Sequence, residues 1–417
     1  MNQFSYIFLF FLVASLLLKL WLNKRQMFHI TLHRNNVPKD FKGKIDLDAH
    51  QKAADYTLAK TQVATISNIL GSGLLVMLTL GGVINILVDV SQAQIANDLW
   101  AGVAIIMSVF IISHLIELPI DIYQTFKIEQ QFGFNRMTAK QFVKDQFLQV
   151  SLMLIIGIPI LYALLLVMGK MGEYWWLYAW LLTLTFTFFM TWLVPTVIAP
   201  LFNKFTPLED EQLKTRIQSL FERCGFKSNG IYVMDGSKRS GHGNAYFTGI
   251  GNNKRIVFYD TLIESLNTDE IEAVLAHELG HFKCKHIVKH MLASTVITLL
   301  GFALLGWLKQ QTWFFDGLGM VMINDAIALL LFILVTPIFT TFLSPIGSHF
   351  QRKFEFEADA FASTMAKPEH LIQALVKLYR ENASTLTPDP IYSNFYHSHP
   401  PASVRINHLK SLSKTAL

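Results

Sequence analysis

The stretch "AHELGHFKCKHIVKHMLASTVITLLGFALLGWL" (276–308) joins a metal-binding pattern to a run that is long enough to cross a membrane. His277 and His281 are four residues apart, so on a helix they share one face and can hold a metal ion between them. Glu278 lies beside them, where it can act as a general base toward water. The apolar part, Met291–Leu308, approaches the ~20 residues that a bilayer-spanning helix needs. Two questions follow: which residue completes the metal site, and on which side of the membrane it lies.

The composition indicates a membrane protein. Of the 417 residues, 52% are hydrophobic and 16% are charged, whereas soluble domains carry about 25% charged residues. The charges mostly border apolar runs and form no basic face interleaved with aromatic residues, so nucleic-acid binding is not expected. With Cys224 and Cys284 alone, a disulfide framework or a cysteine-based zinc site is excluded. We expect Cys284 to be a small helix residue, because sulfur rarely joins an HExxH pair.

Seven apolar runs, nearly free of charge, each approach the length of a transmembrane helix. They are Phe4–Leu22, Ile66–Val88, Trp100–Leu118, Val150–Met168, Trp175–Val197, Met291–Leu308 and Ala326–Leu343. The first run lacks the basic start and the cleavage site of a signal peptide, so we expect it to remain as a helix. The pattern predicts a mainly α-helical, multi-pass membrane protein.

Basic residues in the loops predict the orientation. They gather after the first and third apolar runs, at Lys24, Arg25, Arg34, Lys39, Lys42, Lys44, Lys52, Lys60, Lys127, Arg136, Lys140 and Lys144. The alternate loops hold only Lys170 and Lys309. The positive-inside rule then places the N-terminus outside and the C-terminus in the cytosol. Both long polar segments, 198–290 and 344–417, are therefore expected on the cytosolic side.

The polar segment before the sixth run predicts a small α+β unit. "IYVM" (231–234), "NAYFTGI" (244–250) and "RIVFYD" (255–260) are typical of short strands separated by turns. Asn267 or Thr268 then caps the helix that carries the histidines. A second pair of histidines follows on the next turns, His286 and His290, but it lacks a suitably placed glutamate. We expect that pair to be solvated or interfacial.

The third metal ligand is expected in "RKFEFEADAFA" (352–362). On a helix, Glu355 and Asp359 share a face, while Glu357 points about 200° away and is expected to be solvated. His281 is ten residues before the sixth run, and Glu355 is about ten residues after the seventh. Two antiparallel helices that continue out of the membrane would bring both to similar heights, ~15 Å beyond the apolar boundary. This geometry favours Glu355 as the third ligand.

Two further residues share the face of Glu355. Asp359, one turn on, can accept the free ring N–H of a metal-bound histidine and so determine its tautomer. Arg352, one turn before, can neutralise the carboxylates. The alternative for both residues is an ordinary network of surface charges.

HELGH with EFEAD downstream, among seven apolar runs, resembles the type I CAAX prenyl proteases, the a-factor-converting zinc endopeptidases. Other segments resemble that family in the expected order: "IEQQFGFN" (128–135), "PTVIAPLFNKFTPL" (195–208), "GSKRSGHGNAYFTG" (236–249), "NKRIVFYDTL" (253–262) and "HSHPPASVRI" (397–406). Gln351 and Lys353 depart from the Ser and Arg that the family often shows, but the face of Arg352, Glu355 and Asp359 is kept. The resemblance covers nearly the whole chain.

The resemblance implies seven transmembrane helices around a water-filled chamber, with a small α+β zinc-peptidase domain on the cytosolic side. It implies one Zn²⁺ per chain, held by His277, His281 and Glu355, with Glu278 as general base.

The resemblance also assigns substrate contacts. Asn244, Ala245 and Tyr246 would form an edge strand that binds the substrate backbone by strand addition, and the alternative is an ordinary sheet edge. His399 would stabilise the oxyanion of the tetrahedral intermediate, and the alternative is a structural histidine before a proline turn.

The domain organisation follows from these elements. We expect transmembrane helices one to five with cytosolic loops in 1–197, the catalytic segment with strands and HExxH helix in 198–290, transmembrane helices six and seven in 291–345, and a cytosolic C-terminal segment with the third ligand in 346–417.

Three functions are weighed. The leading hypothesis is a zinc metalloendopeptidase that cuts near the membrane, removing the C-terminal tripeptide of prenylated substrates and cutting peptides upstream. The second is a zinc protease for membrane-protein quality control, which a bacterial source would favour. The third is a transporter or lipid-binding protein with a structural zinc, which Glu278 and an open fourth coordination position argue against.

The expected partners are a peptide or protein substrate, prenylated or not, and the lipid bilayer. The chain is expected to act as a monomer, in the inner membrane of a bacterium or in the endoplasmic reticulum membrane of a eukaryote.

Overall fold

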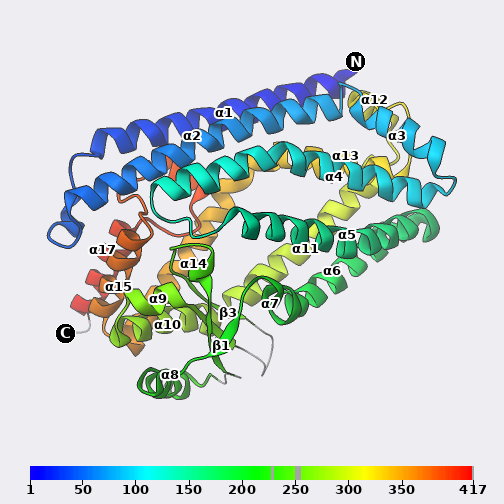
Figure 1. Ribbon diagram of the computed structural model, residues 1–417. Helices are drawn as coiled ribbons and strands as arrows, with labels where there is room; N and C mark the ends of the chain where they lie inside the picture. The colour runs from blue at the N-terminus through cyan, green and yellow to red at the C-terminus, as the bar shows by residue number, and fades with distance from the viewer. Residues whose placement is uncertain (227–229, 249–254, 416–417) are drawn as a thin grey trace.

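The computed structural model describes residues 1–226, 230–248 and 255–415. Within these residues, seven helical segments are long and apolar enough to cross a membrane: Gln3–His33, Leu47–Leu78, Asp98–Glu129, Ala139–Lys170, Gly172–Phe202, His286–Leu308 and Asp325–Met365. They contain helices α1 (Gln3–His33), α2 (Leu47–Leu78), α4 (Asp98–Tyr123), α5 (Ala139–Lys170), α6 (Trp175–Leu193), α11 (His286–Leu308) and α13 (Asp325–Thr340). The predicted seven crossings are confirmed, and Figure 1 shows the N-terminus at the end of the bundle opposite to the strands.

The second crossing differs from the predicted run Ile66–Val88. Helix α2 already ends at Leu78, and the chain turns before α3 (Val83–Gln94) begins. Gly82 in this turn has a φ of 80°, a left-handed conformation that glycine adopts without steric penalty. The apolar run therefore contains a turn, and α2 reaches the length of a crossing because it begins earlier, at Leu47.

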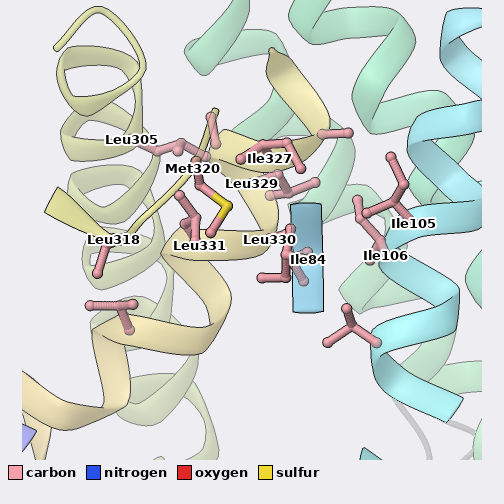
Figure 2. Close-up of a cluster of buried hydrophobic side chains, with 14 of the residues drawn as sticks. Ile84, Ile105, Ile106, Leu305, Leu318, Met320, Ile327, Leu329, Leu330 and Leu331 are labelled. Carbon is pink, nitrogen blue, oxygen red and sulfur yellow. The ribbon is translucent and has the colours of Figure 1, made fainter. Parts of the chain in front are cut away.

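The end of the bundle near the N-terminus is tightly packed. Figure 2 shows apolar side chains from α3, α4, α11 and α13 in one cluster, including Ile84, Ile106 and Leu330. Gly102 of α4 faces Ala326 of α13, where a Cβ atom would lie 2.7 Å from the alanine methyl group. Such small residues let membrane helices approach closely, so α4 and α13 are in close contact here.

The other end of the bundle carries a four-stranded sheet in the order β1-β2-β4-β3. Its strands are β1 (Phe205–Pro207), β2 (Ile231–Met234), β3 (Ala245–Thr248) and β4 (Arg255–Tyr259). Strands β2 and β4 are parallel, and β3 pairs antiparallel with β4. The three predicted strands are confirmed within the described residues, and residues 249–250 of the predicted second strand lie outside them. Strand β3 is at the edge of the sheet.

Helix α10 (Thr268–Lys283) carries the histidine pair and begins with a capping box. The Asn267 side chain accepts from the Glu270 backbone N–H, and the Glu270 side chain accepts from the Asn267 N–H. These reciprocal bonds satisfy two backbone donors that a helix start otherwise leaves unpaired. The predicted cap is confirmed, with Asn267 in that role.

Helix α14 (Ser344–Met365) continues the seventh crossing through a short 3₁₀ turn and packs against α10 (Figure 1). Gly280 lies where these two helices touch. A Cβ atom on Gly280 would lie 2.9 Å from both the Cα and the carbonyl oxygen of Ala358. Real Cβ atoms do not approach backbone this closely, so the glycine permits the helix spacing.

Replacing Gly280 with alanine is therefore expected to push α10 away from α14. Overpacking of this kind costs about 1–3 kcal/mol, and it should also weaken metal binding because the ligands come from both helices. Gly347→Ala in α14 is the matched control, since nothing lies within 4 Å of its added Cβ. Thermal unfolding and metal titration of the purified variants measure both effects. Equal stability and metal affinity of the two variants would contradict the account.

Candidate metal centre

Helices α10 and α14 bring the three predicted ligands together. The Nε2 atoms of His277 and His281 are 3.2 Å apart. The Glu355 carboxylate lies 3.4 Å from the first of these atoms and 3.2 Å from the second. Glu355 and His277 are buried, and His281 is half-buried. The expectation that the transmembrane hairpin returns the chain to the histidines agrees with this geometry.

This donor set fits a metal ion. Two ligands at 2.0–2.1 Å from a tetrahedral zinc are separated by about 3.3 Å, close to the spacings observed here. In addition, Glu355 Oε2 is buried, and its nearest donor atoms are 3.3 and 3.4 Å away, too long for a strong hydrogen bond. Two imidazoles and a carboxylate leave a fourth position open, as catalytic sites require.

Asp359 lies directly behind His277. Its side chain is fully buried, and Oδ1 is 2.8 Å from Nδ1 of His277. When Nδ1–H donates to this carboxylate, the lone pair of Nε2 faces the shared position between the ligands. Asp359 thus stands where the helical spacing predicts it.

The arginine that neutralises the two carboxylates is Arg405 of α17 (Ala402–Thr415). Its guanidinium donates to Asp359 from Nη2 at 2.6 Å and from Nε at 2.9 Å, and Nη1 lies 3.3 Å from Glu355 Oε2. Arg352, predicted for this role, instead donates to the Ser393 carbonyl at 3.1 Å. That prediction was wrong because α17, which no local spacing reveals, covers the carboxylates.

The acids and bases of the centre shift one another's pKa values. Burial and Arg405 act to lower the pKa of His277, but its hydrogen bonds with Asp359 and Glu355 outweigh them and raise it to about 9. Burial acts to raise the pKa of Glu355, yet the bonds with His277 and His281 hold it far below its ordinary value. Burial is likewise outweighed at Asp359, whose pKa is lowered by His277 and Arg405. Both carboxylates therefore stay ionised at neutral pH, and His277 holds a proton that a metal ion would have to displace.

The ligands adjoin a cavity of about 1060 Å³ that reaches between α2 and α4. His399 lines this cavity with 63% of its side chain exposed, and its Nε2 atom is 3.3 Å from Glu355 Oε1. Glu278 is half-buried and close enough to His399 to interact with it electrostatically. His399 therefore connects the cavity, which it lines, with the ligand Glu355 and with Glu278.

The start of strand β3 also reaches this cavity. Asn244 lines it, and the carbonyl of Asn244 accepts from the Tyr259 N–H at 2.9 Å. Ala245 and Tyr246 follow in β3, opposite Phe258 and Val257 of β4. Among the described residues β3 is the edge strand, and no strand of that part of the chain pairs with its other side.

Two residues lie elsewhere than the sequence predicts. His286 is not solvated: its side chain is 2% exposed and contacts His281, with the two Nδ1 atoms 2.9 Å apart. Glu357 points away from the ligands, as predicted, but it is paired with His286 rather than solvated. The helical pattern failed here because α10 ends at Lys283 and α11 starts at His286.

Removing Arg405 is expected to disrupt the centre far more than removing Arg352. Arg405→Ala leaves two buried carboxylates short of a cation, which costs about 3–5 kcal/mol when a buried pair is broken. Arg352→Ala loses one hydrogen bond to a carbonyl, worth about 0.5–1.5 kcal/mol. Denaturation of the two purified variants decides this ranking, and a larger loss for Arg352→Ala would contradict it.

Comparison with known proteins agrees with this geometry. The family model "CAAX prenyl protease N-terminal, five membrane helices" matches residues 26–204, and "Peptidase family M48" matches residues 207–413. The CAAX prenyl protease 1 homolog of Arabidopsis thaliana is 34% identical over 405 residues, 95% of each chain. CAAX prenyl protease 1 of Saccharomyces cerevisiae is 38% identical over 320 residues, 73% of this chain and 70% of the relative.

A solved structure shows the same fold over nearly the full length. The crystal structure of S. mikatae Ste24p matches with a TM-score of 0.90 and 32% sequence identity, covering 98% of this chain and 99% of that one. The expected family and the expected peptidase chemistry are thereby confirmed. The chain belongs to the M48 peptidase family, in the group with the CAAX prenyl protease N-terminal region, and is an integral membrane metalloendopeptidase.

Proposed function

We propose that this protein is a zinc endopeptidase that removes the C-terminal tripeptide of prenylated CAAX substrates and also cuts peptides upstream. The observation that carries the proposal is the set of three donor groups, 3.2 to 3.4 Å apart, next to His399, which lines a cavity that reaches between α2 and α4. His277, His281 and Glu355 would hold one zinc ion. Zinc bound there would polarise the scissile carbonyl and lower the pKa of a water molecule.

Glu278 supplies the proton transfers. Acting as general base, it takes a proton from the attacking water as the oxygen adds to the scissile carbonyl carbon. It then delivers that proton to the leaving nitrogen as the C–N bond breaks, so the products are a carboxylic acid and an amine. Its half-buried place next to His277 in α10 supports this role.

His399 stabilises the oxyanion. A donor must face the position where charge develops, inside a site of low dielectric. The His399 ring lines the cavity, with Nε2 3.3 Å from Glu355 and Nδ1 2.9 Å from the Ser398 hydroxyl. The same position fits hydrogen bonding to the carbonyl oxygen of a bound peptide.

The open edge of β3 binds the substrate backbone. Asn244, Ala245 and Tyr246 offer main-chain groups to an extended peptide, which would add a strand to the sheet. This mode gives affinity for the peptide whatever its sequence, so side-chain and lipid contacts in the cavity decide the choice of substrate.

A lipid chain has partly apolar space beside the cavity. A second cavity of about 310 Å³ is lined by Leu70, Leu74 and Ile116 together with the polar residues Ser113 and His114, and it shares Glu117, Ile120 and Asp121 with the larger one. Because it lies between α2 and α4, a prenyl group could reach it from the bilayer. The printed names of the relatives, CAAX prenyl protease 1 and its homologs, support this substrate class.

The site faces the cytosol and belongs to a single chain. The loops rich in Lys and Arg and the catalytic elements lie on the same side of the predicted crossings. All three ligands come from one chain, which supports a monomer. We propose that membrane helices and catalytic segments alternate along the chain, in the ranges 1–197, 198–290, 291–345 and 346–417. The membrane depends on the source of the protein: the inner membrane in a bacterium, or the endoplasmic reticulum membrane in a eukaryote.

The proposal predicts metal-dependent cleavage of a fluorogenic farnesylated CAAX peptide by the purified protein. A chelator should abolish the cleavage and added zinc should restore it. Glu278→Gln should lower kcat by at least about 10²-fold while the protein still binds zinc. The unprenylated twin peptide shows how far the lipid matters.

Full activity of Glu278→Gln would contradict the mechanism. Equal cleavage of the two peptides would show a peptidase that has no preference for prenylated substrates. No cleavage of either peptide by zinc-loaded protein would overturn the CAAX assignment, and misfolded membrane proteins would then be the substrates to test.

His399→Phe tests the oxyanion role separately. Loss of one such donor typically costs about 10²–10³-fold in kcat, and KM and zinc affinity should change little because the ring is not a ligand. Steady-state kinetics on the same peptide measure this split. A large rise in KM at unchanged kcat would show a binding role instead.

A further inference from the structure

We infer that His286 and Glu357 form a positioning pair for the metal centre, in which Glu357 orients His286 and His286 turns Nε2 of His281 toward the metal. The inference rests on the proposed function in one respect, that His281 is a metal ligand. It goes beyond it by assigning a task to two residues outside the ligand set.

The contacts form an unbroken chain of hydrogen-bonding distances. Nδ1 of His281 lies 2.9 Å from Nδ1 of His286. Nε2 of His286 lies 2.9 Å from the Glu357 carboxylate. The His286 side chain is 2% exposed, so no bulk water competes for either ring nitrogen.

Glu357, the last residue in this series of contacts, determines which ring nitrogen of His286 and of His281 carries the proton. An ionised carboxylate only accepts hydrogen bonds, and a neutral imidazole has one N–H and one lone pair. Glu357 therefore requires the proton of His286 on Nε2, which leaves Nδ1 of His286 as an acceptor. That acceptor places the proton of His281 on Nδ1. The remaining lone pair of His281, on Nε2, then faces His277 and Glu355, where the metal binds.

The ring of His286 is also fixed in orientation. It stacks on Phe354 of α14, with ring centroids 4.3 Å apart and an interplanar angle of 13°. Lys289 lies over the same ring of Phe354 and contacts Glu357 at 3.3 Å. The carboxylate is thus held ionised and in place by a neighbouring cation.

The backbone between α10 and α11 adopts an unfavourable conformation that permits this contact. Lys285 has a φ of 57°, in the left-handed region that residues other than glycine rarely adopt. This residue separates the end of α10 from the start of α11, so the helix is interrupted there and His286 contacts His281. A continuous helix would place residues five apart on different faces.

The arrangement matches the one at the other ligand. His277 has Asp359 behind it at 2.8 Å, and His281 has His286 and then Glu357. Both outer carboxylates come from α14, the helix that also supplies the ligand Glu355. One helix therefore orients both histidines while binding the metal itself.

A second metal site is the competing interpretation of this cluster. Donor atoms of Cys284, His286 and Glu357 lie within 4.8 Å of one another. However, both ring nitrogens of His286 already face hydrogen-bonding partners, and the Lys289 ammonium next to Glu357 opposes a further cation. The geometry therefore favours a hydrogen-bonded pair.

The test compares zinc affinity among purified full-length variants by competition with a chromophoric chelator. His286→Phe keeps the aromatic stack but has no acceptor, and it should bind zinc about 10–100-fold more weakly than wild type, the range for lost outer hydrogen bonds. His286→Asn keeps an acceptor oxygen near the Nδ1 position and should stay within a few-fold of wild type. His290→Phe is the matched control, because His290 touches the same Phe354 ring.

Spectroscopy and metal content complete the test. Cobalt-loaded His286→Phe should show a shifted visible spectrum, while the melting temperature of its metal-free form should match that of His290→Phe. Unchanged zinc affinity of His286→Phe would overturn the inference, as would equal weakening by Phe and Asn. Two zinc ions per chain, with one lost in Cys284→Ser, would also overturn it in favour of a second metal site. Wild-type protein that binds no zinc would instead refute the proposed function, together with the inference that rests on it.

Discussion

The buried carboxylates of Glu355 and Asp359, one helical turn apart, are the constraint that the catalytic end of the protein has to satisfy. Burying an unpaired charge is costly, and such a charge persists only when it is paired and hydrogen-bonded. Arg405 reaches both carboxylates from α17, and His277 reaches both from α10. Three segments far apart in sequence must therefore meet before the site exists, which couples metal binding to the folding of α10, α14 and α17.

The membrane helices bring those segments together. Helix α10 leads directly into the sixth crossing, and α14 continues the seventh. The hairpin between them leaves the site and returns to it, while Gly280 lets the two ligand helices approach to contact. The opposite end of the bundle is packed with apolar side chains, and the cavity lies between α2, α4 and the catalytic segment. The ligand Glu355 is next to this cavity through His399.

Local patterns predicted a large part of this arrangement. Apolar length predicted the seven crossings, and helical spacing placed His277, His281, Glu355 and Asp359. The wrong predictions share one cause: they concern turns and long-range contacts that the helical repeat of a short segment does not reveal. Arg405 lies 46 residues beyond its partner Asp359, on a separate helix. The buried position of His286 depends on the left-handed backbone conformation of Lys285. A prediction that assumes one continuous helix leaves the His286 ring exposed. The turn at Gly82 is likewise hidden inside an apolar run.

The central claim is that the Nε2 atoms of His277 and His281 and the carboxylate of Glu355 hold a single zinc ion. X-ray absorption at the zinc edge of the purified, zinc-loaded protein tests it most directly. The account predicts only nitrogen and oxygen neighbours near 2.0–2.1 Å, with the multiple scattering of two imidazole rings. A sulfur neighbour near 2.3 Å would place Cys284 in the site and contradict the account.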